Sequence, residues 1–418
     1  MSVLPGDYER EALDYAVDLL SRLVSIPTVS PAGDHYEEAA SLLAGELESL
    51  GARVRVERVP SDYQARRCRH ASSAPRFIVL ARLGGGRRTL HFNGHYDVVP
   101  GGPGWTVTEP FKPVVREGRL YGRGACDMKG GIAAVLGALK LAQLRGDEPV
   151  HTVDVALVPD EEIGGECGTG YLVEALLERP PDYVVIPEPS GLSNPWNGHK
   201  GLLWVRVRVR GRTSHASMPW LGRNAFLEAS RLALELHRIL ASTLAGRYTR
   251  YRVDPPEAGR PTFTLGGEAS VPGGGKANQV PGEFQFTIDR RLIPEETVEQ
   301  ARREVEAALL WASTSLGGID YEVEVINSGD PAANDPGELY QALRRAAAGA
   351  GVELGEPLIC PGGLDMHYYT TKGSKALAYG PTCETAHAPD EYVSIDELSK
   401  LIKTFHALAF DPATWRQS

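Results

Sequence analysis

The strongest constraint on the fold is an alternation of short apolar strands with helices. We expect strands at residues 89–92, 152–158 and 183–186, and helices at 130–144 and 169–179. This alternation is typical of an α/β domain whose largely parallel, mixed sheet is covered by helices on both faces. Open sheets of this kind gather ligand sites at the carboxyl ends of their strands. We therefore expect functional residues directly after these strands.

Side chains of the kind that bind metals follow all three strands. His95 comes shortly after the first strand, Glu161 and Glu162 after the second, and Glu188 after the third. Because parallel strands end at one edge, these distant segments have a physical reason to converge. Imidazole and carboxylate ligands without a thiolate suit zinc, cobalt or manganese, and a carboxylate can bridge two ions.

Taken singly, each of these residues also has an ordinary structural interpretation. Asp127 precedes a helix and is a plausible N-cap, and residues 160–162 can form a solvated acidic turn. Asp97 lies two residues after His95, where it either forms a turn or accepts a hydrogen bond from the second imidazole nitrogen. His387 lies in a polar segment near the end of the chain and can be a simple loop residue.

The length of the chain and a change of pattern predict two domains. A chain of 418 residues exceeds one ordinary core. From about residue 198 the order becomes strand-helix-strand-strand-helix-strand, which is typical of an α+β ferredoxin-like unit. In its first strand, apolar residues alternate with arginines that we expect on the face opposite the helices. We therefore expect residues 1–197 and 327–418 to form one discontinuous domain and residues 198–326 an inserted domain.

The charge and composition exclude several classes of partner. A net charge of −10 argues against nucleic acid or an anionic membrane as the main partner. We see no signal peptide in residues 1–10 and no apolar stretch of membrane-spanning length, so a cytoplasmic location is expected. The five cysteines form no Cys-x-x-Cys pair, and we expect reduced thiols, with a packing role for Cys126 favoured over a reactive one.

Five motifs together carry far more weight than their members alone. They occupy residues 93–100, 122–130, 159–165, 187–190 and 385–391. In this order they resemble the di-zinc metallopeptidase and deacylase family of acetylornithine deacetylase, succinyl-diaminopimelate desuccinylase, aminoacylase and glutamate carboxypeptidase. The resemblance implies two divalent ions per subunit, most often Zn²⁺, with Co²⁺ or Mn²⁺ as alternatives. It assigns metal-binding roles to His95, Asp127, Glu162, Glu188 and His387.

The same resemblance implies the catalytic and substrate-binding residues. Glu161 would be the general base, Asp97 would orient His95, and the inserted domain would be a lid that also forms a homodimer. His215 would stabilise an oxyanion across the dimer interface. The residues implied in substrate binding are Asn278, Arg291 and Gly363. In the loop that contains Gly363, Leu364 stands where relatives usually carry a hydroxyl residue.

Three functions remain open at this point. The first is removal of an acetyl or succinyl group from an N-acyl amino acid or diamino acid by a metal-activated water. The second keeps the fold and site but acts as a dipeptidase or carboxypeptidase. The third is a non-catalytic dimeric binding protein, which the complete set of ligands and base disfavours.

Overall fold

The computed structural model describes residues 5–68 and 70–416, which divide into two compact units. Unit 1 comprises residues 1–198, 334–358 and 364–418, and unit 2 comprises residues 199–333 and 359–363. The first four residues of the N-terminal segment in which no signal peptide was expected lie outside the described residues. Among the described residues, no helix is both long enough and apolar enough to cross a membrane.

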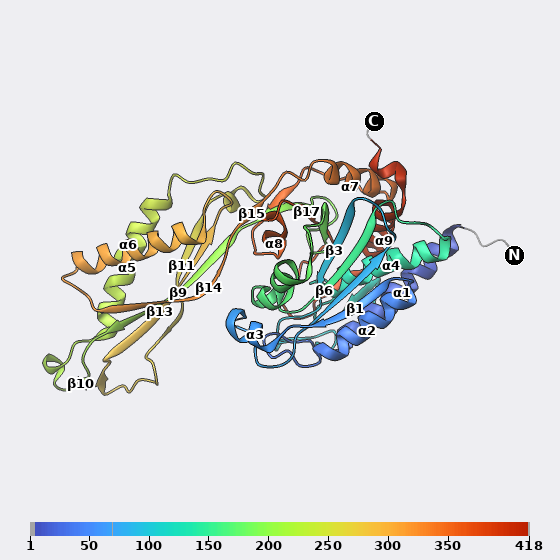
Figure 1. Ribbon diagram of the computed structural model, residues 1–418. Helices are drawn as coiled ribbons and strands as arrows, with labels where there is room; N and C mark the ends of the chain where they lie inside the picture. The colour runs from blue at the N-terminus through green and yellow to red at the C-terminus, as the bar shows by residue number, and fades with distance from the viewer. Residues whose placement is uncertain (1–4, 69, 417–418) are drawn as a thin grey trace. The chain divides into compact units, whose positions relative to one another are not determined.

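A large mixed sheet organises unit 1 (Figure 1). Within this unit its strand order is β1-β2-β6-β3-β7-β17-β8. The three central strands β6, β3 and β7 run parallel, and β17 continues this arrangement, whereas β1, β2 and β8 pair antiparallel with their neighbours. The strands are β1 (Arg53–Arg58), β2 (Phe77–Leu83), β3 (Thr89–His95), β6 (Thr152–Val158), β7 (Tyr183–Ile186), β8 (Trp196–His199) and β17 (Lys375–Ala378).

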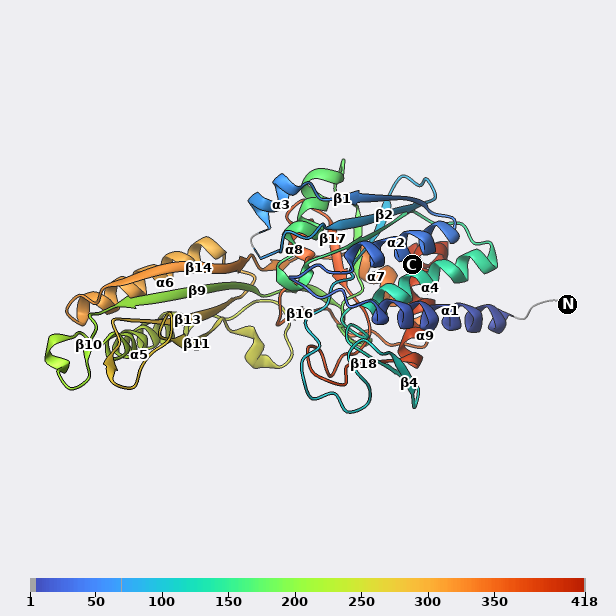
Figure 2. The ribbon, with the colours of Figure 1, turned by 90° about the horizontal axis from the view of Figure 1, so that it is seen from below.

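Helices cover both faces of this sheet, as the alternation predicts. Helices α1, α2, α4 and α9 lie on one face and enclose the main core, while α8 and the segment that follows β6 lie on the other (Figure 2). Strands β3, β6 and β7 are buried along their whole length because both faces are covered. The helices of this unit are α1 (Pro5–Ser25), α2 (Tyr36–Ser49), α3 (Ser61–Arg67), α4 (Lys129–Arg145), α7 (Glu338–Gly349), α8 (Met366–Thr370) and α9 (Ile395–Phe410).

Local structure differs from the sequence expectation in two segments that border the sheet. Residues 60–75 are polar and carry no regular apolar pattern in the sequence, yet α3 occupies Ser61–Arg67. The helix expected at 169–179 instead consists of two π-helical segments, η2 (Glu166–Gly170) and η3 (Leu172–Leu176). Gly168 has non-helical dihedral angles and interrupts regular α-helical hydrogen bonding there.

A small three-stranded sheet lies beside the main one and ends at α9. It has the order β18-β5-β4, with β4 (Val114–Arg116), β5 (Arg119–Tyr121) and β18 (Tyr392–Ser394). The side chain of Ser394 accepts a hydrogen bond from the Glu397 amide and caps the amino terminus of α9. This sheet holds the segments before Asp127 and after His387 together through the antiparallel pairing of β18 with β5.

Unit 2 has the topology expected of a ferredoxin-like fold. Its four antiparallel strands have the order β11-β13-β9-β14, and two helices pack on one face. Every second residue of β9 is buried against these helices, whereas Arg206, Arg208 and Arg210 lie on the other face and pair with glutamates. The elements are β9 (Gly201–Arg210), α5 (Ala225–Leu244), β11 (Thr262–Ser270), β13 (Glu283–Leu292), α6 (Val298–Ser315) and β14 (Tyr321–Gly329).

The cysteines correct one expectation. Cys68 pairs with Cys167, and Cys126 pairs with Cys383, as disulfides. The Cα atoms within the two pairs are 5.5 and 5.6 Å apart, which lies within the usual range for bonded cysteines. The expectation of reduced thiols is therefore wrong for these four residues. Because the paired cysteines lie 99 and 257 residues apart, no local sequence motif indicated the pairing.

Candidate active site

The carboxyl ends of three adjacent parallel strands place the first four site residues. His95 is the last residue of β3 and stands opposite Val158 at the end of β6. Glu161 and Glu162 begin the short 3₁₀ helix η1 (Glu161–Ile163) that follows β6. Glu188 follows β7, which pairs with the other side of β3. The structure therefore brings these distant segments to one edge of the sheet, where open α/β sheets bind ligands.

Asp127 and His387 complete two groups of potential metal ligands that share one carboxylate. One oxygen of Asp127 lies 3.3 Å from His95 Nε2, and the other lies 3.3 Å from His387 Nε2. The remaining member of the first group, Glu188, lies 3.5 Å from His95 Nε2, and that of the second, Glu162, lies 3.1 Å from His387 Nε2. Met128, and not Asp127, is the N-cap of α4, so the Asp127 carboxylate is not used for capping.

The donor set and its spacing fit two divalent cations. Ligand atoms of a tetrahedral zinc site with bonds of about 2.0–2.1 Å lie about 3.3–3.4 Å apart, close to the separations in both groups. Three buried atoms, His95 Nε2, Glu162 Oε1 and Glu188 Oε1, have no hydrogen-bond partner among the described residues. A buried polar atom without a partner is costly. One cation in each ligand group would supply a partner for all three atoms.

The clustered carboxylates of the site also favour the binding of cations. Burial, followed by the neighbouring Glu188, raises the pKa of Glu161 well above its usual range. Burial likewise raises the pKa of Glu188 and, together with Asp127, that of Glu162. Hydrogen bonds to Asp127 and Glu162 raise the pKa of His387 to about 10. Four carboxylates share this site with two imidazoles, and their mutual repulsion would be relieved by bound dications.

Asp97 connects two of these segments. His95 Nδ1 lies 3.0 Å from the Asp97 carbonyl oxygen and 3.3 Å from a carboxylate oxygen of the same residue. The Asp97 carboxylate also accepts hydrogen bonds from the backbone amides of Glu161 and Glu162, at 3.2 and 3.3 Å. Asp97 therefore holds the His95 ring and the acidic turn in one arrangement.

Sequence reasoning missed the residue that positions Asp127. Glu391 is fully buried and accepts hydrogen bonds from the amides of Gly124, Cys126 and Asp127 at 3.0–3.1 Å. Its carboxylate also pairs at 2.6 Å with Arg123, which is equally buried. Glu391 belongs to the motif that contains His387, and its place directly before strand β18 was the available sequence signal.

Two further buried acids support the turn that carries Glu161 and Glu162. Asp160 accepts hydrogen bonds from Arg76 Nε at 2.7 Å and from the Tyr36 hydroxyl at 2.9 Å. Asp365 accepts a 2.5 Å hydrogen bond from Thr169, and burial raises its pKa to about 7. The sequence placed Asp160 in the acidic turn at residues 160–162 but indicated no partner for either acid, because those partners lie far away along the chain.

The oxyanion candidate His215 and the substrate-binding candidates Asn278 and Arg291 lie in the main segment of unit 2, and each has a local partner there. His215 is exposed in β10 (Ser214–His215), and its Nδ1 lies 2.7 Å from the Ser217 hydroxyl. Arg291 makes two hydrogen bonds to the Asp289 carboxylate, at 2.9 and 3.1 Å. Asn278 is exposed, and its carbonyl accepts a hydrogen bond from the Ala216 amide. Gly363 ends the short segment 359–363 of the same unit.

Comparison with known proteins identifies relatives along nearly the whole chain. The model of "Peptidase family M20/M25/M40" matches residues 91–411. Succinyl-diaminopimelate desuccinylase of Delftia acidovorans is 30% identical over 399 residues, covering 92% of this chain and 95% of the relative. The enzyme of that name from Alkalilimnicola ehrlichii is 32% identical over 339 residues, covering 78% of this chain and 85% of the relative.

Solved structures show the same fold at lower identity. The M20 family metallo-carboxypeptidase Sso-CP2 from Sulfolobus solfataricus has a TM-score of 0.75 at 22% identity and covers 94% of this chain and 98% of its own. The dipeptidase Dug1p from Saccharomyces cerevisiae has a TM-score of 0.77 at 17% identity and covers 96% and 97%.

The family match spans more than half of the chain, and it includes all six residues that meet at the carboxyl edge of the sheet. The resemblance noted from the motifs is thereby confirmed. Members of this family bind divalent metal and hydrolyse amide bonds. The chain is a metal-dependent amide hydrolase and belongs to Peptidase family M20/M25/M40.

Proposed function

We propose that this enzyme removes an acyl group, acetyl or succinyl, from the nitrogen of an amino acid or diamino acid. The observation that carries the proposal is the pair of ligand groups sharing Asp127, with Glu161 beside them, its carboxylate 3.9 Å from His95 Nε2. Relatives at 30–32% identity are named succinyl-diaminopimelate desuccinylases, which favours a succinylated amine. Peptidase relatives share the fold at only 17–22% identity.

The chain's own residues would perform the proton transfers. His95 and Glu188 would hold one cation, Glu162 and His387 the second, and Asp127 both. Cations held there supply Lewis acidity that lowers the pKa of a water molecule. Glu161 would accept the proton of that water as it attacks the amide carbonyl, and would then deliver the proton to the leaving nitrogen.

We propose zinc as the native metal, with cobalt or manganese as substitutes. The all-nitrogen-and-oxygen donor set and the ligand spacing support zinc. Metal analysis of the purified protein, without added metal, should find about two zinc ions per chain. A content near one, or magnesium in place of zinc, would contradict this assignment.

A panel of substrates tests the proposed reaction directly. N-succinyl and N-acetyl derivatives of diamino acids and amino acids would be assayed beside dipeptides of the same residues, with zinc present. We expect kcat/KM for the best acyl compound to exceed that for every dipeptide by at least about tenfold, which corresponds to about 1.4 kcal/mol in transition-state binding. Faster hydrolysis of the dipeptides would instead establish a peptidase.

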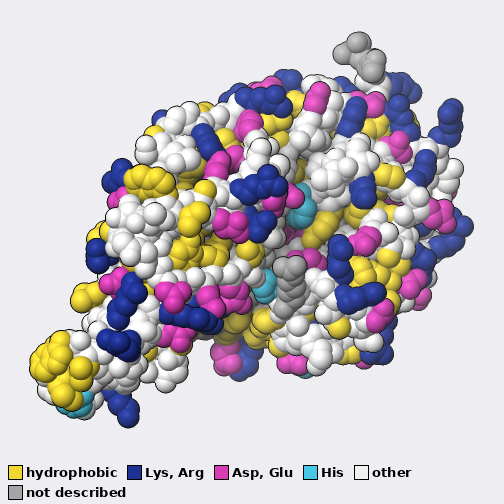
Figure 3. Space-filling view, turned by 60° about the vertical axis from the view of Figure 1, so that its left-hand side comes forward, with side chains coloured by type: hydrophobic (Ala, Val, Ile, Leu, Met, Phe, Trp, Pro, Cys, Tyr) yellow, Lys and Arg dark blue, Asp and Glu magenta, His cyan; other side chains and the backbone are white. Residues whose placement is uncertain are grey.

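We also propose that unit 2 is a lid and dimerisation domain that pairs with a second copy of the chain. Exposed apolar side chains surround His215 in the sequence, and Figure 3 shows hydrophobic side chains gathered over the loop that follows β10. The exposed fraction of Trp220 is 73%, and those of Leu221 and Leu227 are 53% and 55%. Such a patch is unusual on a monomer and supports a protein interface.

The oligomeric state of two variants tests this surface. Trp220→Glu should convert a dimer to a monomer in light scattering after gel filtration, because it places a charge in an apolar interface. Leu310→Glu serves as the matched control, because Leu310 is also exposed (63%) but lies on α6. Its neighbour Trp311 contacts Arg238 of α5. Dimers that resist Trp220→Glu, or a wild-type monomer, would contradict the proposed interface.

The oxyanion-stabilising role of His215 and the substrate-binding roles of Asn278, Arg291 and Gly363 remain part of this proposal. Arg291 is the most informative to test, because its guanidinium already holds one carboxylate, that of Asp289, in a bidentate manner. Arg291→Lys keeps the charge but not the fork. We expect a raised KM for acyl amino acids with a free carboxylate and no change for the corresponding amides.

A cytoplasmic location also remains a proposal. The two disulfides count against it, because such bonds are rare in reducing compartments. Counting free thiols in protein taken directly from its source cells would decide the matter. Five thiols would support the cytoplasm, and a single thiol would favour an oxidising compartment.

A further inference from the structure

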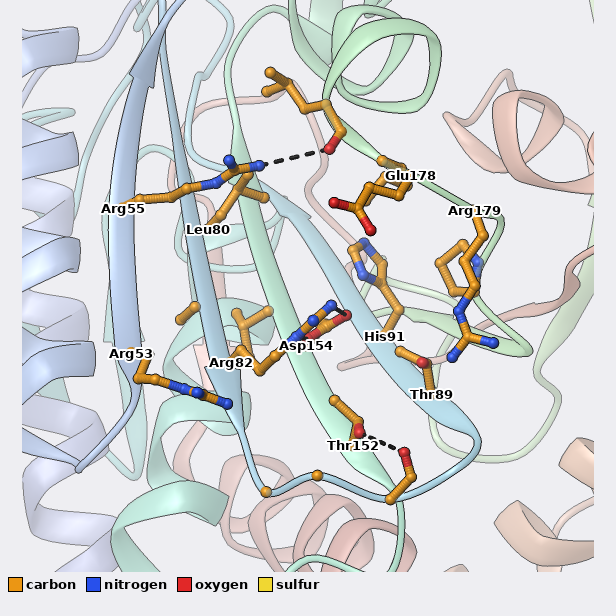
Figure 4. Close-up of a pocket in the computed structure, with 18 of the residues that line it drawn as sticks. Arg53, Arg55, Leu80, Arg82, Thr89, His91, Thr152, Asp154, Glu178 and Arg179 are labelled. Atoms are coloured by element: carbon orange, nitrogen blue, oxygen red, sulfur yellow. Dashed lines mark hydrogen bonds and ion pairs between the residues drawn. The ribbon is translucent and has the colours of Figure 1, made fainter.

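A second cavity lies in unit 1, over the amino-terminal halves of the central strands. It has a volume of about 490 Å³ and is bounded by β1, β2, β6, β3 and residues 176–181. None of the six proposed metal-binding and base residues lines it. Figure 4 shows Arg53, Arg55 and Arg82 on one side, Arg179 on the other, and His91 between them.

The charge of this cavity is opposite to that of the whole protein. Four arginines and two carboxylates line it, giving a net charge of +2, whereas the chain carries −10. Asp154 neutralises Arg82 through two hydrogen bonds of 2.7 and 2.9 Å. Among the described residues, the Arg53 side chain forms no hydrogen bond or ion pair, and the Arg179 side chain forms only a 3.4 Å hydrogen bond to the Arg87 carbonyl. Arg53 and Arg179 therefore retain donors for an anion.

His91 contributes an acceptor to the same cavity. The Tyr369 hydroxyl donates to Asn93 Oδ1 at 2.8 Å, so its oxygen accepts from His91 Nε2–H at 2.9 Å. In this tautomer, His91 Nδ1 carries a lone pair. That atom is buried and lacks a hydrogen-bond partner among the described residues. A ligand with an O–H or N–H group would satisfy it.

The hydrogen bonds behind His91 fix this tautomer from the other side. Asn93 Nδ2 donates to the Thr169 hydroxyl at 3.1 Å, and Thr169 donates to Asp365 at 2.5 Å. The polar side-chain atoms of Asn93, Thr169 and Tyr369 therefore all have partners other than His91 Nδ1. The chain ends at Asp365, whose carboxylate approaches Gly165, just after the turn that carries Glu161.

We propose that this cavity binds a small oxyanion that also carries a hydrogen-bond donor, such as a hydroxycarboxylate or a phosphate with a P–OH group. The guanidinium groups of Arg53 and Arg179 hold the oxyanion, and His91 Nδ1 accepts the hydrogen bond of the donor. Leu80, Leu176 and Leu177 line the cavity as well and leave room for a short carbon chain.

Matched pairs of anions test the proposal by calorimetry on the full-length, metal-loaded enzyme. Inorganic phosphate is compared with sulfate, and malate with succinate, because the first member of each pair alone carries a hydroxyl. We expect a Kd below about 1 mM for at least one donor-bearing anion, and binding about tenfold weaker for its partner. Tight binding of phosphate alone identifies a phosphate site, and tight binding of malate alone a carboxylate site.

Surface variants separate this cavity from the metal centre, which can also bind anions. Arg53→Gln and Arg179→Gln should each weaken binding of the preferred anion about tenfold. Arg58→Gln is the control, because Arg58 lies on the same strand but does not line the cavity. Equal affinity in the Arg53 and Arg58 variants, or no preference within either anion pair, would overturn the proposal. The binding measurement does not depend on which amide the enzyme hydrolyses.

Discussion

The two units use charged side chains in opposite ways. In unit 1, Glu391 and Arg123 are 1% and 2% exposed at their side chains and hold the backbone that presents Asp127. In unit 2, Arg210 and Glu322 form an ion pair on the sheet surface with side chains 54% and 50% exposed. Buried pairs fix geometry at a large cost if one partner is lost, whereas exposed pairs are worth little. The proposed metal site therefore depends on buried charged side chains that do not themselves belong to the two ligand groups.

The largest expected effect is on turnover when the proposed base is removed. Glu161→Gln should keep both metals, because Glu161 belongs to neither ligand group, and should lower kcat by about 10²–10⁴-fold. Steady-state kinetics and metal analysis on the same preparation check both statements. Glu174→Gln, an exposed carboxylate on η3, should retain wild-type kinetics. Comparable activity of the two variants would remove Glu161 from the mechanism.

The next effect sharpens the contrast between buried and exposed ion pairs. Glu391→Gln leaves Arg123 buried without its charge partner, and we expect a loss of about 3–5 kcal/mol in the free energy of unfolding. Metal affinity should also fall about 10–100-fold, because Asp127 loses its anchor. Urea unfolding and competition with a chelator measure the two effects. Glu384→Gln, an exposed carboxylate in the same loop, should change neither by a comparable amount.

A smaller effect concerns pH and the buried His91. Burial lowers the pKa of His91 from 6.5 to about 4 in the folded protein. Its stabilising contribution is complete above pH 6.5 and is lost as the pH falls toward 4, because only the unfolded chain binds the proton in that window. The loss amounts to at most about 3 kcal/mol. The urea midpoints of the wild-type protein and of His91→Gln should therefore diverge as the pH falls through this window. Parallel dependence of the two midpoints on pH would contradict the expectation.

The smallest effect is expected on the surface of unit 2. Arg210→Gln breaks the ion pair with Glu322, yet we expect the free energy of unfolding to change by less than about 1 kcal/mol. Thermal and urea unfolding of unit 2 would measure the change. A loss as large as that of Glu391→Gln would show that exposure does not distinguish the two pairs.

Much of the fold followed from local patterns. Every second residue of β9 is buried, and all residues of β3 and β6 are buried. Their apolar patterns could therefore be recognised from the sequence alone. The π-helical turn at Glu166–Gly170 and α3 were missed, because tertiary contacts set their geometry. Among them, the Cys68–Cys167 bond joins the segments after α3 and inside η2, which lie 99 residues apart.

The sequence by itself determined the chemistry of the site. Short apolar strands followed by His95, Glu161, Glu162 and Glu188 predict a metal site at a sheet edge, since parallel strands must end together. Only the tertiary structure decided how these side chains are held. Glu391, Asp365 and His91 act through partners far away in the chain, and such long-range hydrogen bonds leave no periodic trace in a sequence. The cationic cavity could not be predicted for the same reason, because its arginines come from two separate strands and a loop that meet only once the sheet has formed.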